Sequence, residues 1–302
     1  MKVATNTIYN QIRERINWAN EELNKAIDAV TNGQKINKLS DDPFRLAQIL
    51  ESKVELSDMR QFKKNIEMGE VWLYASESSI SGVQDRIVEA RTTALEMVND
   101  NKNAGDREIG AMKIAELMQD LVEVANTDVN GRYIFAGTKT DQPPFRMINN
   151  QGGESNGTVS TRVEYLGDSK PFEIKTDKNL TVEVGNDGAV MFNSMFDTFI
   201  RLRDALKNND LDGIQEEITT LNDHYEDMAS FGASVGFKLN RLEFRTNVIE
   251  EFDLTTQKQL SDLSEIDLAE AITNMQTKQL AYQASLTAST KVLSSKSLMD
   301  YL

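Results

Sequence analysis

The fold is decided by the stretch ISGVQDRIVEARTTALEM at residues 80–97. Its apolar residues recur at alternating steps of three and four: Ile80, Val83, Ile87, Ala90, Ala94 and Met97. This heptad spacing places them on one stripe of an α-helix, as in helices that pack against a partner along their length. The stretch therefore predicts a helix with one buried face.

The same helix can be extended far toward the N-terminus. Residues 44–142 contain no proline, which is the residue that interrupts helix interiors most strongly. Asp42 precedes Pro43, the usual order of an N-cap and a first helical residue. A helix from Pro43 to about Asn99 would have about 56 residues and a length of about 84 Å. The sequence therefore predicts an elongated rod of long helices.

Amphipathic helices are predicted at both ends of the chain. The first ends at Asn32-Gly33, a typical C-cap, and the last runs from Ile266 to about Ser297 after a capping-box pattern at 264–267. Their apolar stripes are Ile8, Ile12, Ile16, Ala19, Leu23, Ala26 or Ile27, and Val30 at one end, and Leu268, Ile272, Met275, Tyr282, Leu286 and Leu293 at the other. Because both end segments carry almost no net charge, they suit pairing with each other or with copies of the chain.

The middle of the chain has a different periodicity. A helix capped by Asp106 is expected to end near Asn130, and helices over 195–207 and 211–259 follow later. Between them, side chains from Val159 onward alternate between apolar and polar, as in strands with one exposed face. Residues 140–190 are therefore predicted to form a small β module inserted in a helical body.

The composition disfavours several classes of function. The 302 residues carry a net charge of −15, which opposes binding to nucleic acids and to anionic membranes. The chain has no cysteine and a single histidine, His224, so Cys-type and multi-His metal sites are excluded, and no cofactor is expected. It also has no run of about 20 apolar residues that could span a membrane, and its first residues show no apolar core of a cleaved signal. A cytoplasmic protein, or one exported by another route, is expected.

Two motifs suggest chemistry but fit simpler roles better. The sequence GASVG at 232–236 matches a hydrolase nucleophile elbow around Ser234, but its flanks look helical and His224 precedes the serine. Residues 208–213 resemble half of an EF-hand loop, yet Asn208 and Thr219 stand where that loop needs carboxylates. A turn between helices is the better interpretation, and no enzymatic activity is predicted.

Seven segments carry a resemblance to a known family. They are KINKLSDDP at 35–43, GRYIFAGTKT at 131–140, QPPF at 142–145, GFKLNRLE at 236–243, DLAEA at 267–271, QLAYQASL at 279–286 and SLMDYL at 297–302. As a set, they resemble the flagellin-like family of bacterial flagellar proteins, and within it the hook–filament junction proteins. The resemblance implies a mainly α-helical rod with a small β insertion.

The resemblance also implies a division into three domains. Residues 1–42 and 263–302 would form a terminal coiled-coil assembly domain. Residues 43–139 and 191–262 would form a helical rod domain, and residues 140–190 a small outer β domain. In the family, the terminal segments are largely unfolded in the free monomer and order on assembly.

A structural role in the extracellular flagellum follows from the same resemblance. Such a protein joins the hook, through hook-associated protein 1, to the flagellin filament as a ring of copies of itself. It leaves the cell through the flagellar export apparatus with an export chaperone and without a cleaved signal peptide. Binding to nucleic acid or to a membrane is not expected.

The predicted assembly interface lies on the two terminal helices. Its residues are Ile8, Ile12, Ile16, Leu23, Ile27, Leu268, Ile272, Tyr282, Leu286 and Leu293. Three alternatives remain open at this point: a flagellin that forms the filament itself, an extracellular hydrolase centred on Ser234, and a helical adaptor whose ends are already structured.

Overall fold

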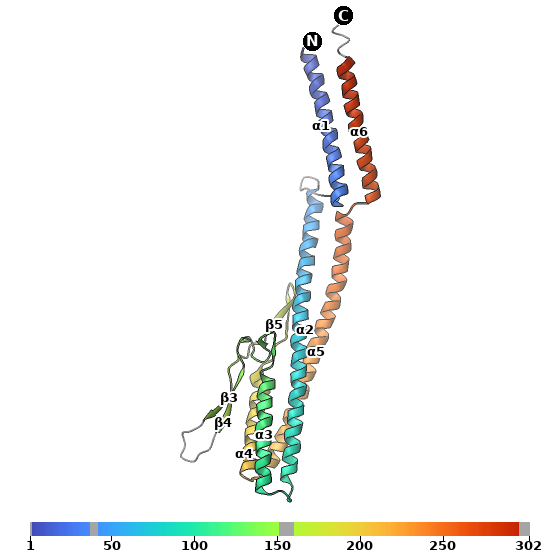
Figure 1. The fold of residues 1–302 in the computed structure, drawn as a ribbon. Coiled ribbons are helices and arrows are strands. Elements are labelled where there is room, and N and C mark those ends of the chain that lie inside the picture. The colour runs from blue at the N-terminus through green and yellow to red at the C-terminus, as the bar shows by residue number, and fades with distance from the viewer. Residues whose placement is uncertain (1, 37–41, 151–159, 296–302) are drawn as a thin grey trace. The chain divides into compact units, whose positions relative to one another are not determined.

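The computed structural model describes residues 2–36, 42–150 and 160–295 and is mainly α-helical (Figure 1). Its helices are α1 (Lys2–Asn32), α2 (Pro43–Val98), α3 (Ala104–Ala125), α4 (Gly188–Lys207), α5 (Leu211–Ser264) and α6 (Leu268–Ser295). The long helix α2 begins at Pro43 as predicted, and the Asp42 carboxylate accepts a hydrogen bond from the Arg45 N–H at 3.0 Å. The predicted N-cap and the mainly helical fold class are confirmed.

Short strands form three two-stranded antiparallel ladders in the described part of the chain. They are β1 (Asp128–Val129), β2 (Arg132–Tyr133), β3 (Phe145–Asn150), β4 (Ser160–Tyr165), β5 (Glu173–Asp177) and β6 (Leu180–Glu183). In the β3–β4 ladder, Phe145 pairs with Tyr165, and in the β5–β6 ladder, Ile174 pairs with Val182. The β insertion is therefore confirmed, whereas Val159 lies outside the described residues.

Two predicted boundaries around α3 are wrong. The N-cap is Asn103, whose side chain accepts a hydrogen bond from the Asp106 N–H at 3.0 Å, while the Asp106 carboxylate accepts one from the Asn103 N–H at 2.9 Å. Asp106 is thus the inner member of a capping box. The helix ends at Ala125 rather than near Asn130, because β1 and β2 form a hairpin there with Asn130 at φ +54°.

The chain divides into two compact units, residues 1–58 with 251–302 and residues 59–250. The second unit has one continuous hydrophobic core, to which α2, α3, α4, α5 and the inner strand residues contribute. All six apolar residues of the 80–97 stripe are buried in it, with exposed fractions of 8% or less. The ring of Phe192 on α4 lies 5.0 Å from that of Phe135 and 5.4 Å from that of Phe145. The predicted stripe is therefore confirmed as a core stripe.

In the first unit, α1 and α6 run antiparallel and side by side (Figure 1). Gly33 ends α1 with φ +68°, and its N–H donates to the Ala29 carbonyl at 2.9 Å, so the predicted C-cap is confirmed. The N-cap of α6 is Asp267, whose Oδ1 accepts a hydrogen bond from the Ala269 N–H at 2.8 Å. The capping box predicted from Ser264 is wrong, because Ser264 is the last residue of α5.

Candidate assembly interface

The terminal helices are joined by a polar contact near the middle of each. The Lys278 Nζ atom on α6 lies 3.0 Å from the Glu22 carboxylate on α1 and 5.8 Å from the centroid of the Trp18 ring. Lys25 also contacts Glu22, at 3.3 Å. Hydrogen bonds from Lys278 and then Lys25 hold the pKa of Glu22 below its usual value. The contact therefore favours an ionised Glu22 at neutral pH.

The face of α6 that is turned toward α1 consists largely of small and polar residues. Its half-buried positions are Ala271, Met275, Lys278, Tyr282, Ser285 and Ser289. Lys278 identifies this stripe as the side that faces α1, because its side chain reaches Glu22. Apart from Met275 and Tyr282, α6 therefore contributes only small or polar side chains to the seam, which limits the apolar area that it buries there.

Three branched apolar side chains of α6 lie beside that seam and stay exposed. Leu268 is 56% exposed, and Ile272 and Leu286 are each 39% exposed. At 100° per residue, these three side chains lie within about 40° of one another around the helix axis. Together they form an apolar stripe, the α6 outer stripe, that α1 does not cover.

The structure separates the predicted interface residues into two groups. Four are half-buried on the two paired helices: Ile12, Ile16, Leu23 and Tyr282. Four are exposed: Ile27, Leu268, Ile272 and Leu286. The side chains of Ile8 and Leu293 lie outside the described residues. An interface between chains formed by these residues stays a prediction.

Sequence reasoning missed the polar contact between the two helices. The signal that could have found it is a lysine at a heptad position of the α6 stripe, between Met275 and Tyr282. A charged residue at such a position needs a partner across the seam, and Glu22 is that partner.

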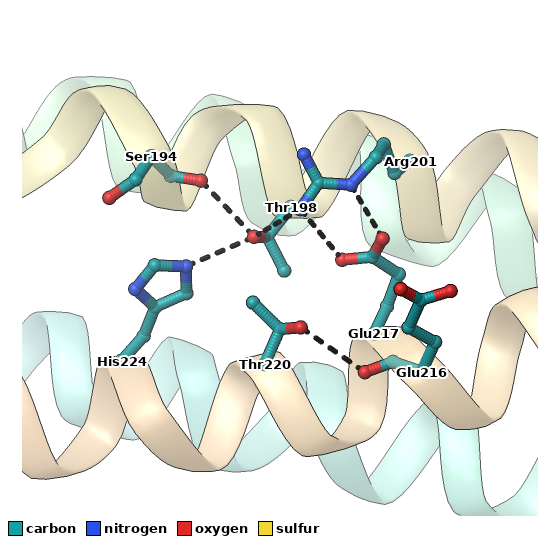
Figure 2. A network of polar contacts seen from close by, with 7 residues as sticks. All are labelled: Ser194, Thr198, Arg201, Glu216, Glu217, Thr220 and His224. Carbon is teal, nitrogen blue, oxygen red and sulfur yellow. Dashed lines mark hydrogen bonds and ion pairs between the residues drawn. The ribbon is translucent and has the colours of Figure 1, made fainter.

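The single histidine belongs to a polar network in the second unit, between α4 and α5 (Figure 2). The His224 Nε2 atom lies 3.0 Å from the Thr198 hydroxyl, which also accepts a hydrogen bond from Arg201 at 3.1 Å. Arg201 in turn binds both carboxylate oxygens of Glu217. His224 is 8% exposed and Glu217 6% exposed, whereas the Arg201 side chain is 54% exposed, so the network joins the two helices from their buried face out to the surface.

Burial lowers the pKa of His224, against the opposing effect of Asp227 and Asp223. Since an unfolded histidine titrates at about pH 6.5, the unfolded chain binds the proton first as the pH falls. The stabilising contribution of neutral His224 is therefore complete above about pH 6.5 and is lost as the pH falls toward the folded-state pKa.

We expect a His224→Gln variant to lose this part of the pH dependence, since glutamine can still bind Thr198 but does not titrate. Denaturant unfolding at several pH values between 7.5 and 5.5 would measure this pH dependence of the free energy of unfolding. The free energy of unfolding of the parent should fall more steeply than that of the variant. Parallel profiles would show that His224 does not gain a proton on unfolding.

The motifs that suggested enzymatic or metal chemistry have structural positions. Ser234 lies in the interior of α5 and is exposed, whereas a nucleophile elbow requires a strand-to-helix turn. Residues 208–210 form the turn between α4 and α5, and the Asp210 carboxylate accepts a hydrogen bond from the Gly213 N–H at 3.1 Å. The interpretation of that segment as a turn is confirmed.

Within the residues that the structure describes, no group of three or more acidic, histidine or cysteine side chains could hold a metal ion. None of the described helices is long and apolar enough to cross a membrane.

Two regions of the chain match descriptions of one protein family. Residues 3–140 match the bacterial flagellin N-terminal helical region, and residues 218–302 match the bacterial flagellin C-terminal helical region. The chain belongs to the flagellin-like family. Both terminal helices of this flagellin-like chain lie in the matched regions, and the strands β3 to β6 lie between them.

Relatives of this flagellin-like chain match it over nearly its whole length. It is 25% identical to flagellar hook-associated protein 3 of Salmonella typhimurium, over 94% of this chain and 95% of the relative. It is 22% identical to a flagellin of Listeria innocua, over 95% of this chain and 93% of that flagellin. The chain is a structural protein of the bacterial flagellum that associates with other flagellar components, and the junction type is favoured over the filament type.

Solved structures show the same fold. FlgL of Bacillus cereus is 18% identical and superposes with a TM-score of 0.57, over 70% of this chain and 99% of that one. The flagellar junction protein FlgL of Legionella pneumophila is 14% identical and superposes with a TM-score of 0.57, over 72% of this chain and 99% of that one. These similarities confirm the flagellin-like helical architecture.

Proposed function

We propose that this flagellin-like chain forms the junction between the flagellar hook and the flagellin filament. The observation that carries the proposal is the α6 outer stripe, which stays exposed although the neighbouring face of α6 already packs on α1. Exposed apolar side chains that share one side of a helix are candidates for an interface between chains. The occupant of the α6 outer stripe would be a terminal helix of a neighbouring copy or of another flagellar protein.

The proposed partners follow from the junction role. Hook-associated protein 1 would contact the chain on the hook side and flagellin on the filament side, with copies of the chain forming the ring between them. The predicted division stays part of this proposal: an assembly domain of residues 1–42 and 263–302, a rod of 43–139 and 191–262, and an outer domain of 140–190.

Export in an unfolded state is part of the same proposal. The chain would pass the flagellar export apparatus with a chaperone and without a cleaved signal peptide. The small and polar residues on the α6 side of the seam support it, because isolated helices gain little stability without extensive tertiary packing. Terminal helices with such a seam can remain unfolded until neighbouring chains bury the α6 outer stripe.

An assembly experiment separates this function from that of a flagellin. Purified chain would be added to hook particles that carry hook-associated protein 1, followed by flagellin monomers. We expect the purified chain alone to stay monomeric, and flagellin filaments to grow only on particles that have received it. Filaments formed by the chain alone would establish the flagellin alternative, and filament growth that does not need the chain would refute the junction role.

A further inference from the structure

The connectors next to the terminal helices are hydrogen-bonded to each other. After α1, the Lys35 N–H donates to the Ser264 carbonyl at 2.8 Å, and the Ile266 N–H donates to the Gly33 carbonyl at 3.2 Å. Gln34 and Glu265 stand opposite each other as an antiparallel bridge between these two bonds. We call residues 33–36 and 264–266 the clasp.

The clasp is tied to the ends of both terminal helices. On one side, Gly33 is the C-cap residue of α1, and on the other, Asp267 caps the start of α6 directly after Ile266. Ile36 is only 7% exposed, and the Lys35 side chain reaches the Asp262 carbonyl at 3.4 Å. The last residue of α1 and the first of α6 are therefore held close together by backbone contacts.

The seam alone specifies the register of α1 on α6 only weakly. Along α6, small residues recur at one heptad position before and after Lys278, as Ala271 and Ser285. A shift of seven residues would keep a similar pattern of half-buried positions on α6 and would lose the contacts of Lys278 with Glu22 and with the Trp18 ring. A single half-buried ion pair of this kind, with side chains 32% and 26% exposed, fixes the register only modestly.

The clasp and the seam agree on one register. Gln34 pairs with Glu265 in the clasp, and Glu22 pairs with Lys278 in the seam. The two pairs are twelve residues apart on the α1 side and thirteen apart on the α6 side, as expected for two antiparallel segments in a single register. A shift by a heptad would break both backbone hydrogen bonds of the clasp. In the shifted register these backbone groups would have to find other partners, and the half-buried residues Gly33, Ser264 and Ile266 would be the most costly to leave unpaired.

We propose that the clasp fixes the register of α1 on α6 and makes the two terminal helices order together. Closing it brings two segments more than two hundred residues apart into one hairpin, which raises the effective concentration of each helix for the other. The register that it sets determines which residues of α1 face which residues of α6. The inference concerns the single chain and does not depend on the junction role.

A disulfide tests the register in the full chain, which has no cysteine of its own. Residues opposite each other between two ladder hydrogen bonds have Cα atoms about 4.5 Å apart, which a disulfide can span. We expect Gln34→Cys with Glu265→Cys to oxidise readily. The control pair, Gln34→Cys with Ile272→Cys, would be opposed only after a seven-residue shift, and we expect at least tenfold slower oxidation. Equal oxidation of the two pairs would overturn the proposal.

Hydrogen exchange measured by mass spectrometry tests whether the helices order together. If amide hydrogen exchange in α1 and α6 is fast in the parent, we expect the disulfide of the Gln34→Cys, Glu265→Cys variant to slow it in both helices by a similar factor. If exchange in the parent is already slow, Ile266→Pro should accelerate it at least tenfold in both helices, because proline removes the donor to the Gly33 carbonyl.

The matched control is Ile266→Ala, which keeps the backbone N–H and should leave both helices within about twofold of the parent rates. A change confined to one helix would overturn the proposal, and so would unchanged exchange in both the disulfide and the proline variants. All these measurements use the monomer, so their results do not depend on whether the chain assembles into a flagellar junction.

Discussion

A Leu286→Asp variant is expected to fold as a monomer but to lose assembly. Leu286 is 39% exposed on the α6 outer stripe, so a carboxylate at this position remains hydrated in the single chain. In an assembled structure that covers the stripe, the same carboxylate would lose its water without gaining a partner, which costs several kcal/mol per copy. Because every copy in a ring would carry the change, we expect motility to be lost.

Complementation of a strain that lacks the junction protein measures this loss as swimming on soft agar. The matched control is Thr277→Asp, which introduces the same side chain into the same helix at an exposed position. At 100° per residue, Thr277 lies about 180° from Leu286 around the helix axis. We expect the Thr277 variant to swim like the parent.

Circular dichroism of the purified monomers shows whether the Leu286 variant is folded. A helical signal equal to that of the parent, together with lost motility, would support the α6 outer stripe as an interface. Normal motility of the Leu286→Asp strain would rule out the stripe as an essential interface, and a collapsed helical signal would show that Leu286 stabilises the single chain instead.

The largest effect on stability is expected for Phe192→Ala. Phe192 is completely buried on α4, and its ring lies among those of Phe135, Phe145 and Phe196, with centroid distances from 5.0 to 6.1 Å. Replacing such a residue by alanine removes apolar burial and leaves a cavity, which costs about 3–5 kcal/mol. The free energy of unfolding of a whole domain is about 5–15 kcal/mol, so this loss is a large part of it.

Denaturant unfolding followed by tryptophan fluorescence measures this change, because Trp72 is buried in the same core. Phe237→Ala is the matched control: it makes the same substitution on α5 at a side chain that is 74% exposed. We expect its free energy of unfolding to stay within about 0.5 kcal/mol of the parent. Equal effects of the two substitutions would show that the aromatic cluster does not hold α4 to the core.

The long helices could be predicted from the sequence because local signals coincide with the hydrophobic period. Pro43 and its cap Asp42 start α2, and the stripe from Ile80 to Met97 is buried throughout. The start of α3 failed because two local signals compete there. Asn103 and Asp106 can each cap a helix, and only the backbone path shows that they act together in one capping box.

The candidate interface could be predicted only in part. The periodicity of α6 identifies an amphipathic helix but not which stripe faces α1, because two stripes with apolar residues lie side by side. Ala271 and Ser285 face α1, although Leu268 and Leu286 are the more apolar choice. The choice depends on how α6 is rotated about its own axis against α1, which the contact between Glu22 and Lys278 reveals.

Most of the secondary structure and the family of this protein could be predicted from the amino-acid sequence, since helix periodicity, caps and family segments are properties of neighbouring residues. Which apolar side chains of α6 remain exposed, and where the single histidine lies, became visible only in the folded chain. These outcomes depend on contacts between residues far apart in the chain, such as His224 with Thr198 or Gln34 with Glu265. Their geometry follows from the packing of whole helices, which no local pattern specifies.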